Sequence, residues 1–385
     1  GGREVPNTEA EAGMKITEVR PILLAIPYKA MDPPSPWTDG ARRQLLVRVA
    51  TDEGLVGVGE AFALGAPLAV CAVIDEVLAP LLVGEPPTEI ERLTDRLHRA
   101  TLLFARRGLG MFAISGVELA LWDLAGKARG VPVYELLGGL AQPRVEAYAS
   151  LLRYARPEQV AAAARGVVAR GFRGVKLHQT DVASVAAARA AIGPDVLLML
   201  DVNCTWSPTE AIRMGRALAE YDLAWFEEPV WPPEDYRALA EVAAALDTPV
   251  AAGENEATAV GFREIIVQRA ADILQPSLTK VGGLGEARKI CALAAAWNVA
   301  VVPHSFYFGP GLAATLHLIA ATPGLRWVEF PGGELETPLL TEPIQAVDGR
   351  IAVPSGPGLG VTVNEEAVTR HPYRPGGARP FTTSR

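Results

Sequence analysis

Three acidic residues each close a short apolar run in the middle of the chain, and their spacing constrains the fold more than any other feature. Asp201, Glu227 and Glu254 follow one another at intervals of 26 and 27 residues, with an alanine-rich helical stretch before each run. That interval fits one strand plus one helix, and in a barrel of parallel strands such residues meet at the C-terminal mouth. Three carboxylates at one place repel one another unless a cation lies between them, and oxygen-only ligands suit a hard ion such as magnesium. The spacing therefore predicts a barrel with a metal site.

Length and composition indicate a large enzyme and exclude several other classes. The 385 residues exceed what a single core normally holds, which favours one barrel plus a smaller domain. A net charge of −8 offers no basic surface for nucleic acid, and three scattered cysteines favour a reducing compartment. No apolar stretch approaches the ~20 residues that span a bilayer, so we expect no membrane partner and a cytoplasmic location. Residues 1–13 are polar, and we interpret them as a tail or cloning remnant before a start at Met14.

Residues 14–139 are predicted to form an α+β capping domain. An alternating strand over 16–26 precedes a hairpin whose turn is Thr51 to Gly54, with strands at 44–50 and 54–60. Helical patterns follow at 67–82, 90–101 and 111–129. The proline-rich loop 28–40 has no periodicity; it is either a lid or a disordered connector, and its length and mixed polarity favour a lid.

Residues 140–340 repeat with a period of about 25 residues, as a (β/α) barrel does. The predicted fold class is therefore α/β, a modified TIM barrel behind an α+β cap. Beyond residue 340 the pattern breaks into turns, and residues 341–385 are expected to pack back on the capping domain. Eight strands are expected, enough to close a barrel, at 145–150, 174–177, 196–201, 223–227, 250–254, 273–275, 300–304 and 326–330.

Motifs along the chain resemble those of one family. They are the run from Ala113 to Lys127, Pro132 to Gly139, Lys176-Leu-His178, Asp201-Val-Asn203, Glu227-Glu-Pro229, Gly253-Glu-Asn255, Lys280-Val-Gly-Gly283 and Pro303-His304. Each is weak alone, but the ordered set, across roughly residues 14 to 360, is similar to the mandelate racemase subgroup of the enolase superfamily. The resemblance implies that Asp201, Glu227 and Glu254 hold Mg²⁺, which binds the carboxylate of a small-molecule substrate. It also implies removal of the proton alpha to that carboxylate, leaving an enediolate that a fixed dication stabilises.

Lys176 and His178 lie two apart on a predicted strand, so both side chains face the barrel interior. In the family the first position contacts the substrate carboxylate, and the second, usually lysine, is a base. Histidine here departs from that pattern. An imidazole, with an ordinary pKa of ~6.5, accepts a proton at neutral pH. His178 is therefore a candidate base; the alternative is a substrate hydrogen-bonding or structural role.

Four further residues are assigned through the resemblance. His304 ends the seventh strand and is the expected acid or base on the opposite face of the substrate. Ser277 stands where the family has an aspartate that orients this histidine; its hydroxyl can fix the ring's tautomer but lends no negative charge. Glu329 is expected to contact the substrate carboxylate and to donate to the enediolate, and Asn203 to bind substrate. Tyr28, where the lid begins, and Ser277 complete the expected substrate-binding set.

The expected reaction divides after the shared intermediate. A hydroxyl beta to the carboxylate would leave as water, which makes dehydration of a sugar-type acid by a hydro-lyase the favoured activity. Without that leaving group, bases on both faces would give a racemase or epimerase. A lactonising relative would carry lysine at Ser277. The other alternative is a metal-dependent binding barrel without turnover, because the family's lysine and aspartate are both replaced. We expect a homo-oligomer.

Overall fold

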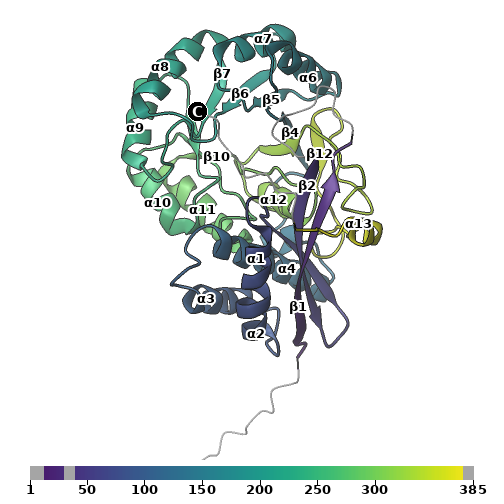
Figure 1. Cartoon of the computed structure of the whole chain (residues 1–385). Helices are drawn as coiled ribbons and strands as arrows, with labels where there is room; N and C mark the ends of the chain where they lie inside the picture. Colours follow the sequence, from purple (N-terminus) through teal and green to yellow (C-terminus); the bar gives the residue numbers. More distant parts are fainter. Residues whose placement is uncertain (1–12, 30–39, 376–385) are drawn as a thin grey trace, which may run out of the picture.

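The computed structural model describes residues 13–29 and 40–375 of the chain. The first element is an antiparallel sheet of β1 (Ile16–Pro27), β2 (Ala41–Thr51) and β3 (Val56–Ala61), in that order (Figure 1). The predicted hairpin is confirmed, with β2 facing β3 and the turn at Gly54, whose φ of +80° favours glycine. Most of the predicted lid, residues 30–39, lies outside the described residues.

One helix, α4 (Leu109–Arg129), holds the cap together. It packs on β3 so closely that a Cβ at Gly59 would lie 2.0 Å from the carbonyl oxygen of Gly116. It is long and apolar enough to cross a membrane, so the expectation that no apolar stretch has that length is wrong, but 89% of its apolar stretch is buried in the protein. Its composition is therefore that of a core helix. The shorter helices of this region are α1 (Pro67–Val73), η1 (Ile74–Leu78), α2 (Ala79–Leu82), α3 (Ile90–Ala100) and α5 (Val133–Leu136).

The second sheet has nine strands, of which eight are parallel, in the order β10-β9-β8-β7-β6-β5-β4-β11. Within the described residues no ladder joins β10 to β11, so the sheet curls into a barrel that its hydrogen bonds leave open at one seam, where β10 pairs over only two residues. The eight predicted strands are confirmed. The observed bounds are β4 (Arg144–Ser150), β5 (Gly174–Leu177), β6 (Leu197–Asp201), β7 (Leu223–Glu227), β8 (Val250–Ala252), β9 (Ile273–Leu274), β10 (Ala300–Val301) and β11 (Trp327–Pro331).

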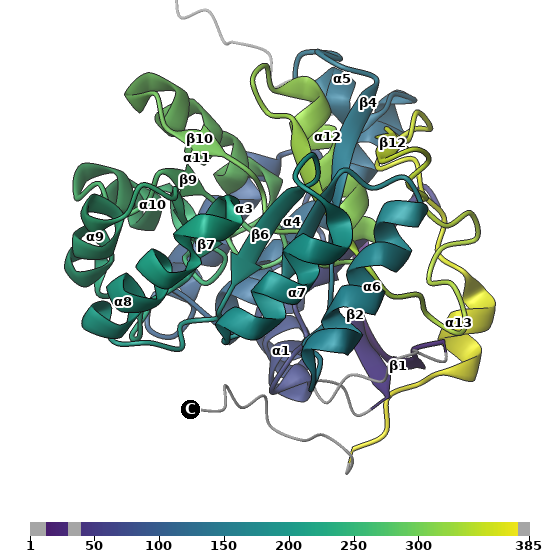
Figure 2. The same cartoon turned by 90° about the horizontal axis from the view of Figure 1, so that it is seen from above.

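Helices surround this sheet, and buried side chains fill its interior. Tyr148, Met199, Trp225, Ala251 and Val302 pack together inside the barrel. Figure 1 shows the helices as an arc outside the strands, and Figure 2 shows α6 beside α7. The arrangement is an α/β modified TIM barrel. The helices are α6 (Pro157–Ala169), α7 (Val182–Ile192), α8 (Pro208–Leu218), η2 (Ala219–Tyr221), α9 (Tyr236–Ala245), α10 (Thr258–Val267), α11 (Leu284–Trp297) and α12 (Pro310–Ala321).

Buried carboxylates join the cap to the barrel by capping helices. Glu118 of α4 accepts the N–H groups of Leu284 (2.8 Å) and Gly285 (2.8 Å), the first residues of α11. A Cβ at Gly283, where φ is +91°, would lie 2.0 Å from the Glu118 Oε2. Glu60 of β3 likewise accepts the N–H of Gly311 (2.9 Å) at the start of α12. Each carboxylate satisfies N–H groups that have no partner inside their own helix.

The C-terminal segment contacts both regions. Strand β12 (Arg350–Ala352) pairs antiparallel with β4, while the backbone of Tyr373 donates to Leu23 of β1 (3.0 Å). Between them Asp123 of α4 accepts the N–H of Leu359 (2.7 Å), and helix α13 (Glu365–Arg370) lies near β1. The division of the chain at residues 139 and 340 stays a prediction.

Glu60 predicts a pH dependence of stability. It is fully buried, and burial raises its pKa to about 7, against the opposing effects of the Gly311 N–H and Arg42. The folded state therefore keeps a proton that the unfolded state releases above its ordinary pKa of 4.5. Relative to Glu60→Gln, the free energy of unfolding of the wild-type protein should fall by about 3 kcal/mol as the pH rises from 4.5 to about 7, and should level off above that range.

Urea unfolding at pH values spanning this window measures the effect. Glu53→Gln, in the exposed turn between β2 and β3, is the matched control and should track the wild type. If the gap between wild type and Glu60→Gln were independent of pH, Glu60 would not be neutral in the folded protein.

Candidate active site

The three predicted metal ligands converge at the C-terminal ends of adjacent strands. Asp201 closes β6 and lies in register with Glu227, which closes β7, while Glu254 follows β8 by two residues. One oxygen from each lies within 4.8 Å of the others, and all three side chains are buried. Three hard oxygen donors at this separation fit a divalent cation such as Mg²⁺ or Mn²⁺.

Charge balance at the cluster also fits a dication. Four carboxylates gather here, those of Asp201, Glu227, Glu254 and Glu329, against the ammonium groups of Lys176 and Lys280. If both imidazoles are neutral and all four carboxylates are ionised, two negative charges have no positive partner. Burial, aided by Asp201 and Glu329 and opposed by Lys176, raises the pKa of Glu227 well above its ordinary range. Glu227 therefore tends to keep a proton. A bound dication would supply the missing positive charge and displace the proton of Glu227.

Lys176 lies among three carboxylates on β5. Its Nζ is 2.8 Å from Glu227 Oε1, 2.9 Å from Glu329 Oε1 and 3.3 Å from Asp201 Oδ2, and its side chain is 0% exposed. Burial alone would lower the pKa of Lys176, but Glu227, Glu329 and Asp201 together raise it well above its ordinary value. This lysine is therefore a fixed positive charge and not a base.

His178 turns one ring nitrogen to the cluster and the other to the backbone. Its Nδ1 lies 2.5 Å from the carbonyl oxygen of Leu151, and its Nε2 lies 3.3 Å from Asp201 Oδ2. A carbonyl oxygen only accepts hydrogen bonds, so Nδ1 carries the proton. In the neutral ring the lone pair is then on Nε2, the nitrogen that faces the carboxylates.

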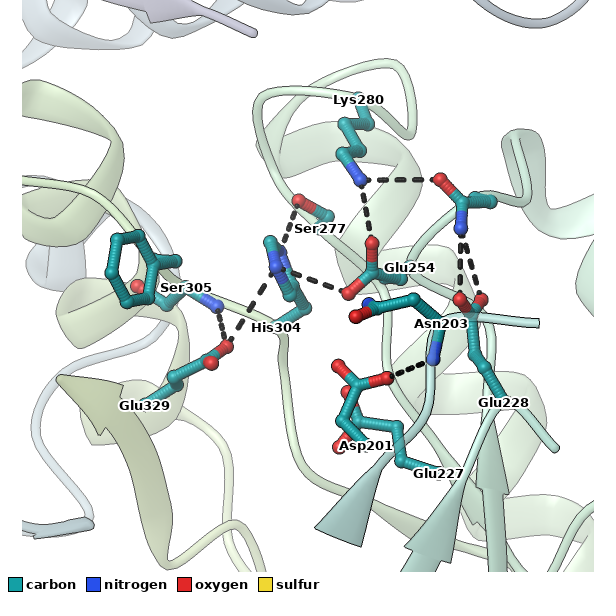
Figure 3. A network of polar contacts seen from close by, with 12 residues as sticks. Asp201, Asn203, Glu227, Glu228, Glu254, Ser277, Lys280, His304, Ser305 and Glu329 are labelled. Carbon is teal, nitrogen blue, oxygen red and sulfur yellow. Dashed lines mark hydrogen bonds and ion pairs between the residues drawn. The ribbon is translucent and has the colours of Figure 1, made fainter. Parts of the chain in front are cut away.

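His304 approaches the same cluster from the loop after β10. Its Nε2 is 3.2 Å from Glu254 Oε2 and 3.8 Å from Glu329 Oε2, and its Nδ1 is 3.0 Å from Ser277 Oγ (Figure 3). Burial lowers the pKa of His304, against the opposing charges of Glu254 and Glu329. The contact between Ser277 and His304, expected from register, is therefore present, and the Ser277 hydroxyl faces this ring.

The remaining predicted residues lie at different distances from the cluster. The backbone N–H of Asn203 donates to Asp201 Oδ1 (2.9 Å), and its own Oδ1 is buried without a hydrogen bond to the described residues. Glu329 accepts the N–H of Ser305 (2.8 Å), next to His304. Tyr28 lies edge-on to Phe308, at 6.2 Å between ring centroids, on the loop that carries His304.

A second layer of polar residues surrounds Glu254, and of these the sequence reasoning gave no site role to Lys280 or Asn255. The Nζ of Lys280 donates to Glu254 Oε1 (2.9 Å) and to Asn255 Oδ1 (3.3 Å), and Asn255 Nδ2 donates to Glu228 Oε2 (2.9 Å). Lys280 begins the Lys280-Val-Gly-Gly283 motif, three residues after Ser277. Burial raises the pKa of Glu228 to about 8, so it adds no charge at neutral pH. Glu256, two residues beyond Glu254, is buried and paired with Arg107 at 2.7 Å.

Comparison with known protein families decides the identity. Residues 159–367 match the enolase C-terminal domain-like family, and residues 34–138 match the N-terminal domain of mandelate racemase / muconate lactonizing enzyme. The chain belongs to the mandelate racemase/muconate lactonizing enzyme family. The resemblance stated from the motifs is confirmed over both regions.

Characterised members of the mandelate racemase/muconate lactonizing enzyme family align over almost the whole chain. A D-galactarolactone cycloisomerase from Agrobacterium fabrum is 36% identical over 92% of this chain and 98% of its own. An arabinonate dehydratase from Saccharolobus solfataricus is 35% identical over 82% of this chain and 87% of its own. The crystal structure of the 3,6-anhydro-D-galactonate cycloisomerase from Zobellia galactanivorans has a TM-score of 0.85 and 32% identity, covering 94% of this chain and 100% of that one. These relatives are lyases and isomerases, enzymes of the two classes expected.

Removing the Lys176 charge should destabilise the fold more than removing an exposed lysine. In Lys176→Met, three buried carboxylates lose their common partner, and we expect the free energy of unfolding to fall by about 3–5 kcal/mol. Urea unfolding in the presence of chelator measures it. The control is Lys29→Met, which removes the exposed ion pair with Glu334 and should cost under about 1 kcal/mol. Equal losses in both variants would contradict the assigned charge balance.

Proposed function

We propose that this chain is a magnesium-dependent dehydratase of hydroxylated, sugar-type acids. One observation carries the proposal: two imidazoles flank the carboxylate cluster, each with Nε2 toward it. His178 follows β5 and His304 follows β10, and the strands that carry the cluster, β6, β7 and β8, lie between them in the sheet. This order suits a base on one face of a bound acid and a proton donor on the other. The names of the dehydratase relatives support the same class of substrate.

Asp201, Glu227 and Glu254 would hold the magnesium ion. Bound there, the ion would polarise the substrate carboxylate and stabilise negative charge that develops on it. Lys176, fixed as an ammonium group beside Glu227 and Glu329, would contact the same carboxylate and share that task. Asn203, with its buried Oδ1 without a partner among the described residues, would accept a substrate hydroxyl. Tyr28 would bind the far end of the substrate.

Two proton transfers complete the reaction. His178 Nε2 takes the alpha proton, and the electron pair of the broken C–H bond moves into the carboxylate to give an enediolate. The pair then returns as the bond from Cβ to the beta hydroxyl breaks, and that oxygen takes a proton from His304 Nε2 and leaves as water. Glu329, 3.8 Å from His304 Nε2, would hydrogen-bond the enediolate. The enol so formed tautomerises to the 2-keto acid, and a proton passes through solvent from His178 to His304, which restores both rings, so that atoms and charge balance over the cycle.

The same pair of imidazoles supports a second candidate, a racemase or epimerase. With an acid that has no beta hydroxyl, the enediolate would take its proton back at the alpha carbon from the opposite imidazole. A binding barrel without turnover remains the third possibility, since Ser277 and His178 replace the family's proton-transfer residues. Cytoplasmic location and a homo-oligomeric state stay predictions from the sequence.

Deuterium exchange separates these candidates. Purified protein with Mg²⁺ is incubated in D2O with mono- and diacid sugars, and NMR follows the alpha proton and any 2-keto product. We expect dehydration of at least one acid, abolished in His304→Asn. Exchange or inversion at the alpha carbon without loss of water would indicate a racemase or epimerase. If no acid in a broad panel gave either exchange or product, the binding barrel without turnover would be the remaining candidate. Full activity of His304→Asn would remove that residue from the mechanism.

Metal binding is tested separately, without turnover. Saturating Mg²⁺ should stabilise the chelator-treated protein, by about 2.7 kcal/mol at a hundredfold excess over Kd, and raise its thermal midpoint. Asp201→Asn should lose most of this shift because one ligand charge is removed. Glu228→Gln, which alters a carboxyl group held by Cys204 and Asn255, is the control that should keep it. An unchanged shift in Asp201→Asn would place the ion elsewhere.

A further inference from the structure

One arginine of the cap contacts the loops that follow two of the three strands of the metal site. Arg107 lies between α3 and α4, and its Nη2 is 2.7 Å from Glu256 Oε2, in the loop after β8. The same Nη2 donates to the hydroxyl of Tyr236 (3.2 Å), the first residue of α9, and Nη1 is 4.0 Å from Glu234 Oε1. Tyr236 and Glu234 belong to the segment that follows β7. A single guanidinium group therefore joins both loops to the cap.

The loop after β8 begins with a turn that carries a predicted metal ligand. The turn runs from Gly253 to Glu256 and is closed by the N–H of Glu256, which donates to the carbonyl oxygen of Gly253 (3.1 Å). Its two central residues are the ligand Glu254 and Asn255. Because the turn is closed by a hydrogen bond, the place of Glu256 limits where the carboxylate of Glu254 can lie.

The backbone of this segment has a conformation that its own residues do not favour. Gly253 has a φ of +127°, and a Cβ there would lie 2.6 Å from the ring of Phe262. Thr258, the first residue of α10, has a φ of +60°, which is rare for a β-branched residue. Such backbone persists only where the surrounding structure fixes it. The segment therefore depends on partners outside itself.

Lysine and arginine side chains supply those partners from two sides. On one side the Nζ of Lys280 donates to Glu254 Oε1 (2.9 Å) and to Asn255 Oδ1 (3.3 Å). On the other side Arg107 pairs with Glu256. The turn is thus held by a cation of the barrel at its centre and by a cation of the cap at its end.

Glu256 is fixed tightly enough to transmit the position of the arginine to the turn. Its side chain is 5% exposed, and its Oε1 accepts the N–H of Ala257 (2.7 Å). A Cβ at Gly261 would lie 2.3 Å from that same oxygen, so the carboxylate lies flat against the first turns of α10. A buried carboxylate is costly to leave without a cation, and the other oxygen of Glu256 meets Arg107.

We infer that Arg107 is a positioning residue of the metal site, which holds the loops after β7 and β8 at the spacing that lets the carboxylates of these strands share one ion. The inference rests on the magnesium site of the proposed function. Carboxylates at the ends of adjacent strands repel each other until an ion binds. Loops that the cap already holds in place lose less conformational freedom on binding, so the anchored site binds the ion more tightly.

Titration of Mg²⁺ into the chelator-treated full-length protein, followed by calorimetry, tests this role. Arg107→Met removes the guanidinium group and keeps an apolar stem. We expect it to raise the Kd for Mg²⁺ roughly tenfold, at the lower end of the ~10–100-fold loss that follows removal of an outer partner of a metal ligand. Arg106→Met, the exposed neighbour in the same loop, is the matched control and should keep the wild-type Kd.

A double-mutant cycle ties the effect to the contact itself. Glu256→Gln breaks the same ion pair from the other end and should raise the Kd by a similar factor. Adding it to Arg107→Met should raise the Kd little further, because both changes remove one contact. Arg107→Lys keeps a cation and should recover part of the affinity. Glu256→Gln and Arg107→Lys also keep the test valid if Arg107→Met folds poorly.

A purely structural ion pair would give a different result. It would lower the thermal midpoint of the metal-free variants and leave the Kd of the folded protein at the wild-type value, which would overturn the inference. An equal rise of the Kd in Arg106→Met would overturn it as well. Failure of the proposed function is distinguishable: the wild type would bind Mg²⁺ with an affinity that depends on Arg107, yet neither exchange nor dehydrate any acid. A wild type that binds no Mg²⁺ would overturn both the metal site and this role of Arg107.

Discussion

Mutual repulsion among four buried carboxylates at the barrel mouth is the constraint on which the rest of the site depends. Lys176 and Lys280 neutralise two of those charges, and each ammonium group contacts at least one predicted metal ligand. The remaining negative charge suits a dication, and the same carboxylates keep Lys176 protonated. A lysine so placed cannot be a base, and this is why we propose the two imidazoles for the proton transfers.

The cap and the barrel hold this cluster in place through helix ends. Glu118 and Glu60 reach from the cap to the first residues of α11 and α12, the helices that follow β9 and β10. Strand β9 leads to Ser277 and strand β10 leads to His304. The carboxylates of Glu118 and Glu60 therefore hold the ends of the two loops that position the His304 imidazole, at the points where these loops enter their helices. The Gly282-Gly283 pair of the family motif admits this close approach. The fold and the site geometry are therefore not independent.

The sequence predicts the strands and the converging carboxylates because both follow from a period: one acidic residue per strand and helix. It predicts the contact of Ser277 with His304 because both positions are tied to motifs of fixed register. The direction of the Tyr307 side chain, whose hydroxyl forms a hydrogen bond with Ser277, cannot be predicted in this way. It depends on a turn in which the Tyr307 N–H donates to the carbonyl oxygen of Ser305 (2.9 Å), and not on the alternation of a strand. The same holds for Glu256, whose burial requires Arg107 from the cap. Contacts between distant loops have no periodic signal in one chain.

The central claim is that residues 201, 227 and 254 share one divalent ion between the two imidazoles. Anomalous diffraction from a crystal soaked with Mn²⁺ tests it most directly, because the ion is located without reference to activity. We predict one strong peak in contact with an oxygen of Asp201, Glu227 and Glu254, with His178 and His304 on either side. A peak elsewhere, or none at the three carboxylates at saturating Mn²⁺, would contradict the account.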